Sequence, residues 1–147
     1  MRSMWDPWTA ASDEWPLVAI RSEPLPGRRL GEIRDRGTVI VLRAGITRAQ
    51  ATSTLAHELV HLERGLLGCR GQWRAREEFL VHAEAARRLI PLCSLADALR
   101  HVGSDEERHV ATVLGVDRYT LRVRVSGLTE LERAGLGRLL RRCEWVA

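Results

Sequence analysis

The stretch LAHELVH, residues 55–61, decides our interpretation of this chain, because it places two histidines and a glutamate on one predicted helix. His57 and His61 are four residues apart, so their imidazoles lie one helical turn apart on the same face. Both rings can then reach one metal ion, and Glu58 beside them can reach a water at the metal without ligating the ion itself. Zinc suits such a site, because three protein ligands leave a fourth position for water.

The residues around this stretch predict where its helix begins and ends. Thr47, followed three residues later by Gln50, is the pattern of a capping box, and Gly65 predicts the end of the helix. Leucines at positions 55, 59 and 62 form the apolar stripe that we expect to face the core.

The residues before this helix predict a small antiparallel sheet. The runs Leu30–Arg34 and Thr38–Arg43 flank a turn at residues 35–37 and predict a β-hairpin, and Trp15–Arg21 predicts another short strand. Residues 1–14 have no periodicity, so we expect an irregular lead-in that packs a tryptophan or two on the body. If the strand at residues 38–42 is the sheet edge nearest the metal, it could pair with an extended substrate.

The rest of the chain predicts helices. Their expected positions are Trp73–Ile90, Ser94 to near Gly103, Ser104–Leu114, a helix capped by Asp117, and a last helix with a capping box of Thr129 and Glu132. The predicted fold class is therefore α+β, with a small antiparallel sheet packed on the HExxH helix and a helical C-terminal half. We expect a core at residues 1–95 and a helical subdomain at 96–147 packed on it.

A third metal ligand must come from outside the HExxH stretch, and the predicted helix over residues 73–90 offers several candidates. Glu78 and His82 border its apolar stripe, whereas Glu77 projects to the wetter side. A buried carboxylate needs a compensating partner, which a metal supplies, so we expect Glu78 to be the third ligand, with Glu77 next. The sequence leaves four roles open for His82: a metal ligand, a residue that orients a metal ligand, an oxyanion donor, or an ordinary packing residue. Tyr119, the single tyrosine, could donate to an oxyanion, but nothing in the sequence places it near a metal.

Composition narrows the class of protein. The 147 residues are 45% hydrophobic and 29% charged, which is typical of one folded domain. No run approaches the roughly 20 apolar residues of a membrane helix, and the first residues do not resemble a signal peptide. The three cysteines at 69, 93 and 143 form no C-x-x-C pair, which argues against a disulfide scaffold and a zinc finger. We therefore expect a cytoplasmic protein with no membrane partner.

Three segments together resemble the ImmA/IrrE family of zinc metallopeptidases, above all its compact actinobacterial and actinophage forms. They are TLAHELVHLERG at residues 54–65 after the TVIVL run at 38–42, EEFLVHAEAARRLIPL at 77–92, and the later run at 110–136. The resemblance implies a zincin-like fold with a metallopeptidase core at residues 1–95. It further implies a zinc-dependent endopeptidase in which His57 and His61 ligate zinc and Glu58 is the base. It also implies a protein substrate, commonly a helix-turn-helix repressor of a phage or mobile element.

The third ligand is where this chain departs from the family pattern. Many members have Glu-Ala-Asp before the Ala-Ala pair, at the place where this chain has Leu80, Val81 and His82. The resemblance therefore implies that the glutamate ligand has moved to Glu78 or Glu77.

The C-terminal end supports a competing hypothesis. Residues 117–142 hold seven arginines and three acidic residues. The net charge of this segment is therefore +4, which equals the net charge of the whole chain. A helix-turn-helix pattern precedes and overlaps this segment, at Ala111, Gly115, Val116 and Leu121. The alternative function is thus a DNA-binding or repressor-binding regulator with a non-catalytic metal site. Because apolar residues are interleaved with the arginines, we favour a protein partner, contacted by Arg118, Arg122 and Arg124, over nucleic acid.

Overall fold

The computed structural model describes residues 5–65, 73–102 and 106–141, and in these ranges the chain is α+β and mostly helical. The strands are β1 Ala19–Glu23, β2 Gly31–Arg34 and β3 Val39–Arg43, with a short 3-10 turn, Asp35–Gly37, between β2 and β3. The helices are α1 Pro7–Glu14, α2 Arg48–Arg64, α3 Arg74–Leu89, α4 Leu92–Val102, α5 Glu107–Leu114, α6 Arg118–Ser126 and α7 Glu130–Arg141. None of these described helices has the length and apolar composition needed to span a bilayer.

The sheet is mixed, so the expectation of a purely antiparallel sheet is wrong. The predicted hairpin is confirmed, because β2 pairs antiparallel with β3 and Ile33 lies opposite Ile40. However, β1 pairs parallel with β3, and the strand order is β1-β3-β2. After β1 the chain skips the neighbouring position in the sheet and forms β2 beyond it. Strand β3 then fills the skipped position and runs parallel to β1. As a result β3 is the central strand, so the condition for substrate pairing at residues 38–42, an edge position, is not met.

The first described residues form a helix where an irregular lead-in was expected. The Asp6 carboxylate accepts a hydrogen bond from the Thr9 backbone N–H at 3.0 Å, and Pro7 is the first helical residue. An N-cap aspartate followed by proline is a helix-start pattern that we did not recognise in the sequence. The Trp8 indole donates to the Thr52 hydroxyl at 3.1 Å, so a tryptophan does pack on the body as expected.

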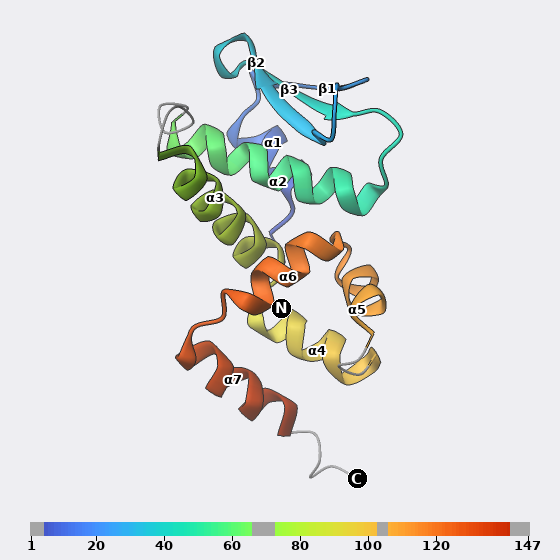
Figure 1. The fold of residues 1–147 in the computed structure, drawn as a ribbon, viewed down its shortest axis with the longest axis vertical. Helices are drawn as coiled ribbons and strands as arrows, with labels where there is room; N and C mark the ends of the chain where they lie inside the picture. The colour runs from blue at the N-terminus through green and yellow to red at the C-terminus, as the bar shows by residue number, and fades with distance from the viewer. Residues whose placement is uncertain (1–4, 66–72, 103–105, 142–147) are drawn as a thin grey trace.

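Helix α2 is the centre of the molecule. Its predicted capping box is confirmed, since Gln50 N–H donates to Thr47 Oγ1 and Gln50 Oε1 accepts from Thr47 N–H. Figure 1 shows the sheet on one side of α2 and helices α3 to α7 on the other. The sheet-side cluster includes Leu55, Leu59, Ile40 and Leu42, and the helix-side cluster includes Ala56, Val60, Val81 and Ala85. Helix α2 therefore contributes to two hydrophobic clusters, and its orientation is fixed from both sides.

The C-terminal helices begin largely as predicted. Asp117 caps α6 by accepting from Thr120 N–H at 2.7 Å, and Thr129 and Glu132 form the predicted capping box of α7. Between α5 and α6, Gly115 adopts a left-handed conformation with φ of 67°, which a residue with a side chain rarely adopts. Helix α4 runs across residue 95, where we expected a boundary, and residues of α4, α5 and α6 share one hydrophobic cluster with α2 and α3.

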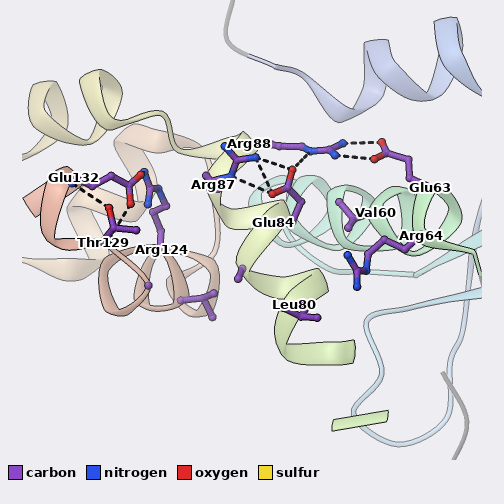
Figure 2. A pocket seen from close by; sticks show the side chains of 13 residues that line it. Val60, Glu63, Arg64, Leu80, Glu84, Arg87, Arg88, Arg124, Thr129 and Glu132 are labelled. Carbon is purple, nitrogen blue, oxygen red and sulfur yellow. Dashed lines mark hydrogen bonds and ion pairs between the residues drawn. The ribbon is translucent and has the colours of Figure 1, made fainter. Parts of the chain in front are cut away.

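Arg124, which we expected to contact a partner, is buried and bonded within the fold. Its side chain is 4% exposed and donates to the Ile90 carbonyl at 2.9 Å and to Glu132 at 2.7 Å. Figure 2 shows it beside Glu132 and Thr129. It thereby joins α6 to the end of α3 and to α7, and its hydrogen bond lowers the pKa of Glu132 to about 2. By contrast, Arg118 and Arg122 are exposed and both pair with Glu107.

We predict that Arg124→Ala lowers the free energy of unfolding by about 3 kcal/mol, because it leaves a buried carbonyl and a carboxylate without their donor. Arg122→Ala is the matched control on the same helix and should change stability much less, since its ion pair is exposed. Urea denaturation monitored by circular dichroism measures both. Equal destabilisation by the two variants would contradict the structural role of Arg124.

Candidate metal centre

Three side chains from two helices bring potential metal ligands together. The His57 and His61 Nε2 atoms are 3.0 Å apart, and the Glu78 carboxylate oxygens lie 3.3 Å from His57 Nε2 and 3.5 Å from His61 Nε2. Two ligands about 2.1 Å from a tetrahedral metal lie about 3.4 Å from each other, so these separations fit one ion. His57, His61 and Glu78 could therefore hold a metal ion.

The packing of α3 on α2 decides which carboxylate joins the histidines. Val81 and Ala85 of α3 are buried in one cluster with Ala56 and Val60 of α2, which turns the Glu78 face of α3 toward α2. Glu77, one residue earlier, points elsewhere on the helix and forms a two-point ion pair with Arg64 at 2.6 and 2.9 Å. Of the two glutamates that the sequence left as candidates, the structure thus brings Glu78 to the histidines and leaves Glu77 in an ion pair.

His82 lies beside the three-residue group and not within it. Its ring centroid is 4.1 Å from that of His57, with the ring planes tilted by 38°. On its other side lies the ring of Tyr119, at 5.0 Å and nearly perpendicular. His82 therefore connects the metal-ligand group on α2 and α3 to the first turn of α6.

Glu58 is buried but has no hydrogen-bond partner among the described residues. Its side chain borders a cavity of about 220 Å³ that is also lined by His57, His82 and Tyr119. Burial raises the pKa of Glu58 to about 8, and the negative charges of Glu78 and then Glu32 add to the effect. A carboxyl group with a pKa near neutrality can both accept and return a proton, which is the property of a general base and acid.

The imidazole of His57 is in the state that a metal requires. Burial, followed by the charges of His82 and His61, lowers the pKa of His57 to about 3, so the ring is neutral near neutral pH. Its Nδ1 is buried without a hydrogen-bond partner in the described part of the chain. The other nitrogen, Nε2, faces His61 and Glu78 and is the atom available to a metal.

Strand β2 passes very close to Glu58, and Gly31 makes this approach possible. A Cβ atom at position 31 would overlap Thr54 Cγ2 and would lie 3.1 Å from Glu58 Oε1. Only a residue without a side chain fits between β2 and α2 at this point. The sequence analysis did not identify Gly31, although a glycine at the start of a strand is a known signal of close backbone approach.

The first turn of α6 lies at the same cavity, which the sequence analysis also did not foresee. The Asp117 backbone N–H donates to Ser53 Oγ of α2 at 3.1 Å, and Asp117, Tyr119 and Thr120 line the cavity. In helix-turn-helix proteins the first turn of the second helix is the part that contacts DNA bases. Here the N-cap residue of α6 is bonded to α2, α6 itself packs mainly on α3, and Arg118 and Tyr119 of its first turn are exposed.

Figure 2 shows a second cavity, of about 440 Å³, which is lined by many charged side chains. Arg88 of α3 pairs with Glu63 of α2 and with Glu84, and Arg87 also pairs with Glu84. Because these charges are satisfied by one another, this cavity lacks the unpartnered polar groups found around Glu58.

Comparison of the chain with models of known families, with curated proteins and with solved structures finds no match. The chemical interpretation of the site therefore depends on its own residues and geometry.

We predict that Gly31→Ala destabilises the protein by about 1–3 kcal/mol, because the new methyl group must displace β2 or the side chains of Thr54 and Glu58. Gly137→Ala in α7 is a suitable control, since its methyl group would meet only the flexible end of Arg141. The control should be neutral or stabilising by up to about 1 kcal/mol. Thermal or urea unfolding measures both, and a neutral Gly31→Ala would contradict the close approach of β2 and α2.

Proposed function

We propose that this chain is a zinc-dependent endopeptidase with a zincin-like site, in which His57, His61 and Glu78 bind the metal and Glu58 is the general base. The observation that carries the proposal is the position of Glu58. It is a buried carboxyl group without a hydrogen-bond partner in the described ranges, and it lies at a cavity beside three side chains that could hold a metal ion. Burying such a group is unfavourable unless a cation or a reacting proton accompanies it.

The proposed reaction is hydrolysis of a peptide bond. When bound, zinc supplies Lewis-acid chemistry that polarises the scissile carbonyl and makes water more acidic. Glu58 takes one proton from the attacking water as the new carbon–oxygen bond forms. Glu58 then delivers that proton to the amide nitrogen as the carbon–nitrogen bond breaks, which leaves a carboxylic acid and an amine.

A protein substrate would bind in extended form along β2. This strand passes over Glu58 at Gly31, and its side away from β3 is an edge of the sheet. An extended segment can add to such an edge through backbone hydrogen bonds. The resemblance of the sequence to ImmA/IrrE peptidases supports a helix-turn-helix repressor of a phage or mobile element as the substrate, cleaved in the cytoplasm.

The alternative, a DNA-binding or repressor-binding regulator with a non-catalytic metal site, has less support. Arg124 is buried, and the N-cap residue of α6, Asp117, is bonded to Ser53 of α2. Arg118 and Arg122 are exposed, yet both already share Glu107 as a counter-ion. We therefore keep Arg118 and Arg122 as proposed contacts for a protein partner.

We predict about one zinc ion per chain, with binding weakened at least 10-fold in Glu78→Gln and abolished in His57→Ala or His61→Ala. Glu77→Gln is the matched control, because it is the adjacent glutamate and its carboxylate is paired with Arg64. Metal analysis after dialysis and a competition titration with a zinc chelator give the stoichiometry and the affinity. Weakened zinc binding in Glu77→Gln with normal binding in Glu78→Gln would assign the third ligand to Glu77 and contradict the proposed site.

We predict that Glu58→Gln retains zinc but hydrolyses peptides at least about 10²-fold more slowly, because the amide keeps the size of the side chain and cannot accept the proton. The assay incubates the zinc-loaded protein with a mixed-sequence peptide library and identifies products by mass spectrometry. Glu77→Gln again serves as the control and should cleave like the wild type. Equal, zinc-dependent cleavage by Glu58→Gln would remove Glu58 from the reaction.

A further inference from the structure

We infer that Tyr119, on the first turn of α6, is a further catalytic residue whose hydroxyl group donates a hydrogen bond to the carbonyl oxygen of the scissile peptide bond. This inference rests on the proposed peptidase function and extends it to the C-terminal helices. The covalent steps remain those described above, and the tyrosine keeps its proton throughout.

The reaction needs a donor at this oxygen. As water adds to the carbonyl carbon, negative charge develops on the carbonyl oxygen, and a hydrogen-bond donor placed there in advance lowers the barrier. Glu58 cannot supply this donor while it holds the proton for the leaving amine. A second group that faces the same cavity can supply this donor and add to the polarisation by zinc.

Tyr119 is positioned for this role. It lines the cavity together with Glu58 and His57, and its side chain is 56% exposed, so that a substrate entering the cavity can reach it. The other hydroxyl-bearing side chains at the cavity, Ser53, Thr54 and Thr120, are shorter and are all buried. Among the described residues, Tyr119 thus offers the longest hydroxyl-bearing side chain at the open side of the cavity.

Two contacts hold Tyr119 in place. The ring packs perpendicular to that of His82, and His82 in turn packs on the metal-ligand candidate His57. Two residues earlier, the Asp117 backbone N–H is bonded to Ser53, which fixes the start of α6 to α2. An edge-to-face aromatic contact together with an anchored helix start limits the positions that the phenol can adopt.

The kinetic test compares Tyr119→Phe with the wild type on a peptide that the library assay identifies. We expect kcat to fall about 10²-fold, with zinc stoichiometry unchanged and KM changed by less than about twofold, because the lost bond forms mainly in the transition state. Trp73→Phe is the matched control, since it removes an N–H donor from another exposed aromatic residue, which does not line this cavity. A kcat of Tyr119→Phe within twofold of the wild type would overturn the role of Tyr119.

A spectroscopic test does not depend on turnover. Because the chain contains a single tyrosine, biosynthetic replacement by 3-fluorotyrosine gives one ¹⁹F resonance that reports on Tyr119 alone. We expect this resonance to shift when a peptide phosphonate, which mimics the tetrahedral carbon, is added to the zinc-loaded protein. An unmoved resonance at a phosphonate concentration that calorimetry shows to be saturating would overturn the inference.

The two proposals can fail separately. Wild-type kcat in Tyr119→Phe combined with loss of cleavage in Glu58→Gln would contradict only the role of Tyr119. Wild-type cleavage by Glu58→Gln would contradict the proposed function, and the inference about Tyr119 would fall with it.

Discussion

The structure depends above all on the burial of α2 from two sides. Leucines of α2 pack against the sheet, and Ala56 and Val60 pack against α3. Such a helix cannot rotate or slide without exposing one of the two clusters. The other faces of α2, which carry His57, His61 and Glu58, are therefore fixed in orientation as well. The rigidity of the candidate metal centre is in this sense a consequence of core packing.

Electrostatics makes the same region favourable for a cation. Glu58 is buried near Glu78 and Glu32, and these two negative charges, together with burial, raise its pKa. Elsewhere in the described structure, glutamates such as Glu63, Glu77 and Glu84 have arginine partners. Among the described residues Glu58 has no such partner, and a bound metal ion would provide the positive charge that its surroundings there do not supply.

Helices α5 and α6 are joined by a tight turn, and the start of α6 lines the cavity beside Glu58. Gly115 makes the tight turn and Leu121 is buried, as the pattern predicts. However, the short turn carries α6 directly to α2, where Asp117 is bonded to Ser53. Arg124 is turned inward to the Ile90 carbonyl and Glu132, so this member of the arginine-rich pattern serves packing. Charge in a sequence does not indicate whether a side chain faces solvent or a buried acceptor.

The features that depend on local geometry could be predicted from the residues alone. The four-residue spacing of His57 and His61, the capping boxes at Thr47 and Thr129 and the β2–β3 hairpin all follow from the helical or strand period and from nearby hydrogen bonds. The preference for Glu78 over Glu77 also follows from a local pattern, the apolar stripe of α3. The parallel pairing of β1 with β3 and the positions of Tyr119 and Gly31 beside the site could not be predicted in this way. These outcomes depend on which faces of distant elements pack together. Because packing is a property of the whole chain, no local pattern encodes it.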